Sequence, residues 1–268
     1  NTIGVIVPHI DHPYFARLLS SLETAAYKSG YKLLLFNSGE RDEKEDRYLE
    51  MCKGSRVAGI ILCSGRGETQ CFEGLGVPLV TVERFLESGT AAVECDNRQG
   101  GRLAAKHLLE RGCRKVVYLG GENEENMPAD DRALGFMEVC LREGLEFLDP
   151  GREKDAGLYA SLDYHSYIEK ILEAHPEIDG IFASSDVIAA QVIQICGKKG
   201  IRIPEQVKVV GFDDCGLASM TTPSITTIRQ PVDEMAQLAV EMLIRANRNE
   251  LVPSRTTLPV TLIRRETT

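Results

Sequence analysis

The sequence predicts an α/β protein built from two Rossmann-like lobes, each a parallel sheet covered by helices. Two observations support this fold class. Short apolar runs alternate along the chain with longer stretches whose apolar residues recur at helical spacing, as in parallel sheets covered by helices. The alternation also runs through twice and restarts after residues 120–125, which indicates a boundary between two lobes there.

The strands of the first round are continuous apolar runs, as expected for strands that are buried on both faces. We predict strands at residues 3–7, 32–36, 59–62, 79–82, 92–95 and 115–119. Helices are predicted at residues 13–27, 42–52 and 98–110. Gly30 and Gly112 suit the C-terminal caps of the first and the third of these helices.

The second round has the same character but a longer irregular stretch. Helices are predicted at residues 131–142, 164–174, 187–198 and 232–245, and strands at 180–183, 207–212, 224–228 and 258–264. Residues 144–157 are rich in Gly, Asp and Pro, and we expect them to be irregular.

Length and composition indicate a globular protein without a membrane span. The 268 residues suffice for one large domain or two ordinary ones, and 43% of them are hydrophobic. No apolar run approaches the roughly 20 residues that cross a bilayer. The formal charge is −9, from 31 Lys and Arg against 40 Asp and Glu, so the chain is a poor DNA binder by itself. If the protein acts on DNA, we expect another segment to bind it.

The start of the chain indicates a longer protein, and its cysteines point to the cytoplasm. The chain begins with Asn1 and no leader precedes the first strand, so we expect a chain cut from a longer one. No two of the eight Cys have the C-x-x-C spacing of a zinc or redox site. We therefore expect free thiols in a reducing cytoplasm, with disulfides as the alternative.

The motifs of enzymes and cofactor sites are missing from the sequence. Residues 65–70 begin like a dinucleotide-binding turn but lack the third glycine. His9 and His12 flank Asp11, yet the sequence shows no second ligand cluster for a metal ion. No nucleophile–base pair is evident either, so we expect neither an enzyme nor a cofactor or metal.

The most informative segment is residues 207–231. Its apolar strand runs directly into Asp213 and Asp214, and a second strand candidate ends in Arg229-Gln230-Pro231. Ligands of open α/β sheets bind beyond the carboxyl ends of strands. A carboxylate at this place is suited to accept hydrogen bonds from a neutral polar ligand.

The whole chain resembles the effector-binding core of the lactose/galactose-repressor (LacI/GalR) family of bacterial transcription regulators. The order and spacing of the motifs carry this resemblance more than any single one. They include TIGVIVPHIDHPYF at 2–15, VPLVTVER at 77–84, VECDNRQGGRLAAKHLLERGCRKVVYLGG at 93–121, DDRALGF at 130–136, GIFASSDVIAA at 180–190, VVGFDD at 209–214, TTIRQP at 226–231 and LIRRETT at 262–268.

The resemblance implies the type I periplasmic-binding-protein-like fold, in which three crossover strands join two lobes around a ligand cleft. Carried over, one lobe holds residues 1–121 and 230–255, and the other holds 122–229 and 256–268. Family members also carry an N-terminal helix-turn-helix head, and we expect this chain to be the core without that head. Because such heads bind paired half-sites, the resemblance implies a homodimer on operator DNA.

Two site residues follow most directly from the resemblance. Asp213 matches the family's cleft carboxylate and is expected to accept hydrogen bonds from the ligand, with a helix or turn cap as the alternative. Arg132 matches the cleft arginine, whose rigid fork of donors suits neighbouring oxygens. Its alternative is an exposed helix arginine.

The other candidates keep their alternatives open. Asp96 matches a carboxylate at the lobe interface, or caps the following helix. Tyr14 and Phe15 match the aromatic pair after the first strand, with one side chain expected to face the ligand and the other the core. Ser185 and Asp186 stand where the family has Asn-Asp, and we expect both to lie at the ligand, Ser185 with a shorter side chain that offers one hydroxyl. The alternative for Asp186 is a cap of the following helix.

Arg84 and Gln230 complete the expected site. Arg84 follows Glu83 where the family often has Asp-Arg, and we expect it to contact the ligand. Gln230, at a crossover, is expected to touch either the ligand or the hinge.

The predicted function is the effector-sensing part of a cytoplasmic regulator. A small polar metabolite, a sugar or sugar derivative with a purine as the alternative, is expected to bind and to couple lobe closure to operator affinity. The rival readings are a periplasmic sugar-binding protein of an uptake system and a Rossmann enzyme.

Overall fold

The computed structural model describes residues 1–63, 74–84, 86, 91–120, 128–148 and 161–268, and they form two compact units. The first unit comprises Asn1–Cys95 and Pro231–Leu258, with a short piece ending at Pro128. The second comprises Asp96–Asn123, Ala129–Gln230 and Pro259–Thr268. Residues 65–70, where the sequence analysis rejected a dinucleotide-binding turn, lie outside the described residues.

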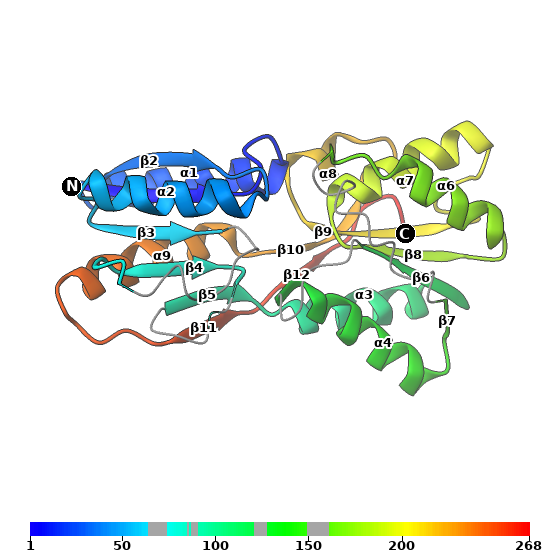
Figure 1. Cartoon of the computed structure of the whole chain (residues 1–268). Coiled ribbons are helices and arrows are strands. Elements are labelled where there is room, and N and C mark those ends of the chain that lie inside the picture. The colour runs from blue at the N-terminus through cyan, green and yellow to red at the C-terminus, as the bar shows by residue number, and fades with distance from the viewer. Residues whose placement is uncertain (64–73, 85, 87–90, 121–127, 149–160) are drawn as a thin grey trace. The chain divides into compact units, whose positions relative to one another are not determined.

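The first unit is a parallel six-stranded sheet in the order β11-β5-β4-β3-β1-β2 (Figure 1). Its strands are β1 (Thr2–Val7), β2 (Lys32–Asn37), β3 (Gly59–Leu62), β4 (Leu79–Val82), β5 (Ala91–Cys95) and β11 (Arg255–Leu258). Its helices are α1 (Pro13–Lys28), α2 (Asp42–Gly54) and α9 (Val232–Asn247). The buried residues of α2, such as Leu49 and Cys52, pack with Ile6 and Ile60 of the sheet.

The second unit is a six-stranded sheet in the order β12-β10-β9-β8-β6-β7, in which only β12 pairs antiparallel among the described strands. Its strands are β6 (Lys115–Leu119), β7 (Glu146–Leu148), β8 (Gly180–Ala183), β9 (Lys208–Asp213), β10 (Thr226–Arg229) and β12 (Thr261–Ile263). Its helices are α3 (Asn97–Glu110), α4 (Asp131–Glu143), α6 (His165–Ala174), α7 (Asp186–Lys199) and α8 (Gly216–Met220), preceded at α4 by the 3-10 turn η2 (Pro128–Asp130).

The units divide the chain earlier than the sequence analysis predicted. We placed residues 96–121 in the first lobe, whereas α3 and β6 belong to the second unit. The physical reason is that α3 packs against α4, and β6 pairs with β7 and β8. Hydrophobic periodicity predicts a helix or strand but does not tell which sheet it joins.

The strand predicted at residues 258–264 was also wrong as a single element. The structure has two strands there, β11 in the first sheet and β12 in the second. Two short elements, β7 and α8, were not predicted, because three and five residues are too few to establish a period.

The chain passes between the units at three places where a strand meets its boundary. These are Cys95–Asp96 after β5, Gln230–Pro231 after β10 and Leu258–Pro259 after β11. We call them the first, second and third crossings. The second and third lie close to the lobe boundaries that the resemblance implied, at residues 229–230 and 255–256, whereas the first lies well before the implied boundary at residues 121–122.

Local chemistry explains where the helices begin and end. The prediction that Gly30 caps α1 is confirmed: its φ is 78°, and the amides of Gly30 and Tyr31 donate to the carbonyls of Tyr27 and Ala26 at the end of α1.

Among the described residues, seven cysteines are buried and form no disulfide with one another. No described helix is long and apolar enough to span a membrane.

Candidate functional site

Asp213 ends β9 and has a strained backbone. Its φ is 106°, and that of Asp214 is 53°, values that residues other than glycine adopt rarely and mostly where surrounding structure enforces them. The Asp213 side chain is buried, and its Oδ1 accepts a 2.8 Å hydrogen bond from Nε2 of Gln230. The carboxylate is therefore held at the carboxyl end of a parallel strand, where the sequence analysis placed it.

Gln230 lies at the second crossing and is only 1% exposed. Its Nε2 donates to Asp213, while its Oε1 has no hydrogen-bond partner among the described residues. A buried polar atom without a partner carries a free-energy cost and calls for an explanation. A ligand hydroxyl or amine that donates to this oxygen would remove the cost.

Arg132 is the second residue of α4, and its guanidinium is fixed from three sides. Nε donates to Oδ1 of Asn97 at 2.7 Å, and Nη1 donates to the carbonyl of Ser184 at 2.7 Å. The guanidinium carbon lies 3.6 Å from the centroid of the Phe212 ring. Arg132 is 8% exposed, so the alternative of an exposed helix arginine is wrong.

Two glycines allow α4 to approach α3 closely enough for the Arg132–Asn97 bond. A Cβ atom on Gly101 would lie 2.0 Å from the carbonyl oxygen of Arg132, and one on Gly135 would lie 2.0 Å from that of Arg98. Any side chain at either position would push the helices apart. The position of the Arg132 guanidinium thus depends on the close packing of α3 against α4.

Asp96 and Ser185 both serve as N-caps. Oδ1 of Asp96 accepts the amide of Gln99 at 2.8 Å at the start of α3, and Oγ of Ser185 accepts the amide of Ile188 at 3.3 Å at the start of α7. Both side chains are partly buried. For Asp96, capping was the alternative to a ligand contact in the sequence analysis. For Ser185, capping was not predicted, because the sequence analysis gave that role to Asp186.

Asp186 does not cap α7, which corrects the alternative reading of this residue. It is 0% exposed, and its two carboxylate oxygens accept bonds from the Thr227 hydroxyl at 2.6 Å and the Cys215 amide at 2.9 Å. Burial raises the pKa of Asp186 to about 7, with Asp214 adding to the effect. Because both oxygens already have protein partners inside the unit, the structure assigns Asp186 to the interior and not to a surface that a ligand can reach.

The aromatic pair of the first unit lies at the N-terminus of α1. Tyr14 and Phe15 are both buried, and their ring centroids are 5.1 Å apart in an edge-to-face arrangement. His12 caps the helix by accepting the Tyr14 amide at Nδ1, and its ring packs against Phe15 at 5.6 Å. Burial lowers the pKa of the neighbouring His9.

Arg84 also belongs to the first unit and forms a buried ion pair. Its Nη1 lies 3.3 Å from Oε1 of Glu45 on α2, and both side chains are 5% exposed. The pair ties the end of β4 to α2. The sequence analysis did not predict Glu45 as its partner.

The sequence analysis missed Asn97, Phe212 and Ser184 as parts of the Arg132 environment. Asn97 stands inside the motif VECDNRQGG, and Phe212 directly precedes Asp213, so both were within quoted motifs. Their role depends on the contact with Arg132, which lies 35 positions after Asn97. No local pattern in the sequence announces such a contact.

Together, the second unit presents complementary hydrogen-bonding groups at one end of its sheet. Asp213 supplies a carboxylate, Gln230 an acceptor oxygen and Arg132 a fork of donors that lies over an aromatic ring. Such a set suits a small neutral molecule that carries several hydroxyl groups.

Comparison with known proteins adds independent information. Residues 105–268 match the periplasmic binding protein-like domain. The chain is 35% identical over 272 residues to the ribose operon repressor of Halalkalibacterium halodurans, a match that covers 99% of this chain and 79% of that protein. It is 33% identical over 261 residues to the sucrose operon repressor of Streptococcus mutans, covering 97% of this chain and 79% of that protein.

A solved structure shows the same fold. It is a periplasmic binding protein/LacI transcriptional regulator from Alkaliphilus metalliredigens complexed with D-xylulofuranose. The two chains are 34% identical, with a TM-score of 0.87 over 100% of this chain and 98% of that one.

Proposed function

The chain belongs to the LacI/GalR family of transcription regulators as its effector-binding core, and we propose that its second unit binds a sugar or sugar derivative through Asp213, Gln230 and Arg132. Family membership confirms the resemblance and the type I periplasmic-binding-protein-like fold. It also makes the chain an effector-sensing domain and not an uptake protein, because the relatives named above are operon repressors. They are repressors and not enzymes, and we infer binding without turnover.

The single observation that carries the proposal is the arrangement around Gln230. Its buried Oε1 lacks a partner among the described residues, while its Nε2 is held by Asp213. A sugar hydroxyl can donate to Oε1, a second can donate to the carboxylate, and Arg132 can donate to a ring or hydroxyl oxygen. The names of relatives support a sugar: two are repressors of ribose and sucrose operons, and a third holds D-xylulofuranose.

We propose that Tyr14, Phe15 and Arg84 provide the first unit's share of the effector contacts. The aromatic faces of the α1 N-terminus suit the apolar face of a sugar ring. Because both units would contribute residues, effector binding would favour one arrangement of the two units over others. A coupling of roughly 1–3 kcal/mol changes operator affinity about 5–150-fold.

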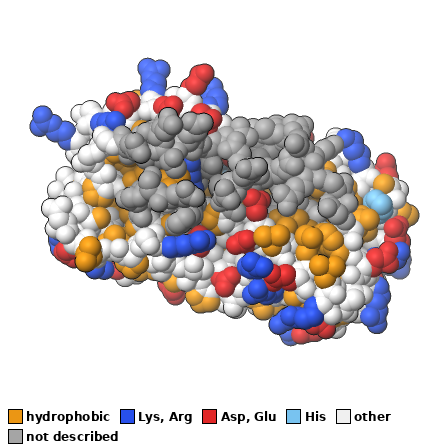
Figure 2. Space-filling view, turned by 60° about the horizontal axis from the view of Figure 1, so that its bottom comes forward, with side chains coloured by type: hydrophobic (Ala, Val, Ile, Leu, Met, Phe, Trp, Pro, Cys, Tyr) orange, Lys and Arg blue, Asp and Glu red, His pale blue; other side chains and the backbone are white. Residues whose placement is uncertain are grey.

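The proposed DNA partner is an operator that is bound through a segment outside this chain. The chain carries a formal charge of −9, and on the face shown in Figure 2 basic and acidic side chains are interspersed without a basic patch among the described residues. Phosphate contacts require clustered Lys and Arg. We infer a cytoplasmic location from this role.

We also propose that the protein forms a homodimer through the free edge of the first sheet. The edge strand β2 carries Leu35, which is 42% exposed, next to the partly buried Leu33 on the same face. An exposed edge strand with apolar side chains is a template for pairing with another chain.

A thermal-shift screen of this chain against sugars, sugar phosphates, polyols and purines tests the proposed function. A ligand that binds the native state raises the melting temperature, by an amount that grows with ligand concentration over Kd. We expect pentoses or their derivatives to give the largest shifts in melting temperature. Calorimetric titration with the same compounds should then show 1:1 binding. A shift with purines alone would contradict the sugar assignment, and conversion of the ligand during incubation would contradict binding without turnover.

A further inference from the structure

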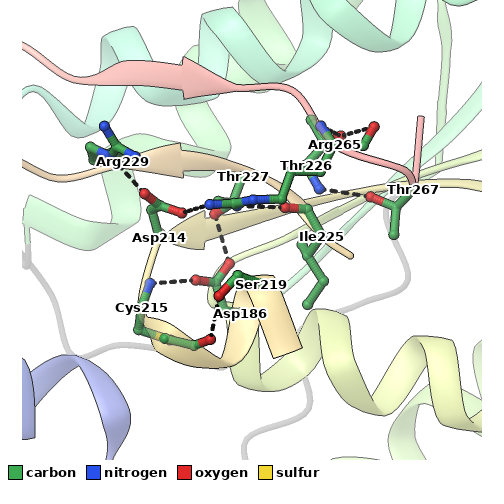
Figure 3. Close-up of polar contacts among 11 residues, drawn as sticks. Asp186, Asp214, Cys215, Ser219, Ile225, Thr226, Thr227, Arg229, Arg265 and Thr267 are labelled. Atoms are coloured by element: carbon green, nitrogen blue, oxygen red, sulfur yellow. Dashed lines mark hydrogen bonds and ion pairs between the residues drawn. The ribbon is translucent and has the colours of Figure 1, made fainter. Parts of the chain in front are cut away.

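The Asp214 carboxylate contacts two arginines, Arg229 and Arg265 (Figure 3). Oδ2 of Asp214 lies 2.6 Å from Nε of Arg229, the last residue of β10. Its Oδ1 lies 2.6 Å from Nη2 of Arg265, which follows β12. One buried carboxylate thus pairs with Arg229, which lies just before the second crossing, and with Arg265, which lies after the third crossing. We call these three residues the Asp214 clamp.

Arg265 is fixed by more than its ion pair. Its Nη1 donates to the Ile225 carbonyl at 2.8 Å, and its backbone amide donates to the Thr226 hydroxyl at 2.9 Å. The Asp214 side chain is 5% exposed, whereas Arg229 and Arg265 are 48% and 20% exposed. Losing either arginine would remove an ion-pair partner from a buried charge, a costly change.

The first unit has a similar arrangement on its own crossing strands. Oε1 of Glu94, on β5, lies 2.6 Å from Nε of Arg255 and 3.0 Å from Oγ1 of Thr257, both on β11. The Glu94 side chain is 4% exposed. β5 leads into the first crossing and β11 into the third. We call these three residues the Glu94 clamp.

The third crossing segment, residues 255–265, is therefore held at both ends by buried carboxylates. Glu94 holds its start in the first unit, and Asp214 holds its end in the second. Asp214 is also the residue next to Asp213, and the two side chains have different partners: Asp213 bonds Gln230, and Asp214 bonds Arg229. A shift of the turn at Asp213 displaces Asp214 and both of its arginines.

We propose that Asp214 and Glu94 are positioning residues that couple the effector-binding turn to the crossing segments and so set the preferred arrangement of the two units. This inference deepens the proposed function and rests on it for its consequence, the transmission of effector binding. Neither residue needs to touch the effector. The clamps themselves are testable without any effector.

The test uses the unliganded chain and the variants Asp214→Asn and Glu94→Gln. Removing a charge-assisted bond should raise hydrogen–deuterium exchange at least tenfold, since such bonds are among the stronger ones. The increase should appear at residues 226–230 and 262–266 for Asp214→Asn and at 92–95 and 255–258 for Glu94→Gln. Small-angle scattering should show a radius of gyration outside the wild-type error for both variants.

Glu138→Gln is the matched control for a merely structural effect. Glu138 also pairs with two arginines, Arg98 and Arg102, but both lie on helix α3 and on no crossing segment. This variant should leave the radius of gyration and the exchange of the crossing strands at wild-type values. Arg265→Lys, which keeps a cation beside Asp214, should stay closer to wild type than Arg265→Gln.

Wild-type exchange and scattering in Asp214→Asn, or equal changes in Glu138→Gln, would overturn the proposal. If Asp214→Asn does not fold, Arg229→Gln probes the same clamp through a half-exposed side chain, with the same expected increase at 226–230. Neither hydrogen–deuterium exchange nor scattering needs an effector. Failure of the chain to bind sugars would therefore contradict the proposed function, but the comparison of the variants would still test the role of the clamps.

Discussion

The guanidinium carbon of Arg132 lies 3.6 Å from the centre of the Phe212 ring, and Phe212 directly precedes Asp213. A cation over an aromatic face is stabilised by about 0.5–2 kcal/mol, depending on desolvation. The stack, together with the bonds to Asn97 and Ser184, gives the guanidinium one orientation before any ligand arrives. A preorganised donor costs less free energy to use than one that must be ordered on binding.

Arg132→Lys keeps the charge but loses the planar fork and the stack. We expect its affinity for the effector found by the screen to fall at least tenfold, since a charged hydrogen bond contributes about 1.5–3 kcal/mol. Arg132→Ala should in addition lower the free energy of unfolding by about 1–3 kcal/mol, because the buried hydrogen bond between Arg132 and Asn97 is lost. Calorimetric titration and urea unfolding measure the two effects.

Arg142→Ala is the control on the same helix, since that side chain is 59% exposed. It should change neither quantity. Wild-type effector affinity in Arg132→Lys would remove Arg132 from the site.

Asp213→Asn tests the carboxylate without disturbing the backbone, because Asn tolerates positive φ better than most residues. We expect effector affinity to fall about 10–100-fold, with a small change in the free energy of unfolding. Glu205→Gln, an exposed carboxylate in the same unit, serves as the control. Calorimetry that finds equal affinity for Asp213→Asn and the control would argue against a ligand contact here.

Asp213 and Gln230 illustrate what the sequence could reveal. Each follows an apolar run that predicts a strand, and ligands of α/β sheets bind at the carboxyl ends of strands, so both residues could be placed at one edge. The structure confirms that they are in contact. Their contact with an effector stays a prediction.

Asp186 and Glu94 illustrate what the sequence could not reveal. Asp186 precedes a helical pattern, so a helix cap was its alternative reading, whereas its partners Thr227 and Cys215 lie 41 and 29 positions away. Glu94 lies within a strand that is otherwise apolar, and its partner Arg255 is 161 positions away. Pairings between distant segments follow from the tertiary fold and leave no periodic signal.

Gly101→Ala tests whether the close packing of α3 against α4 sets the position of Arg132. The added Cβ would lie 2.0 Å from the Arg132 carbonyl oxygen, so the helices must separate. Overpacking of this kind costs about 1–3 kcal/mol, and we also expect weaker effector binding. Urea unfolding and calorimetry of the same variant measure both.

Gly197→Ala, in α7, is the matched control, because a Cβ there meets no atom within 4 Å. This change should leave stability unchanged or raise it by about 0.5–1 kcal/mol, since alanine favours helix more than glycine does. Equal destabilisation by the two substitutions would show that the close packing of α3 against α4 is not the cause of the stability loss in Gly101→Ala.

Asp186 should make the protein lose stability as the pH rises from about 4 to 7. Burial raises the pKa of Asp186 from its ordinary value of 3.8 to about 7, so the folded state binds the proton more tightly than the unfolded state. The contribution is fully present below the unfolded pKa and is lost as the pH rises through the folded pKa. A tenfold change in proton affinity corresponds to about 1.4 kcal/mol, so the loss is at most about 4 kcal/mol.

Asp186→Asn resembles the protonated carboxyl, because its amide can donate to the Thr227 hydroxyl while its oxygen accepts the Cys215 amide. Urea unfolding at several pH values between 5 and 8 should therefore show a wild-type midpoint that falls relative to that of the variant. Comparing the two proteins at each pH cancels the other groups, such as Glu138, whose two arginines lower its pKa to about 2, and His107, whose burial lowers its pKa to about 4. Parallel curves for wild type and Asp186→Asn would mean that Asp186 stays ionised in the folded protein, with its charge balanced by the Thr227 and Cys215 donors.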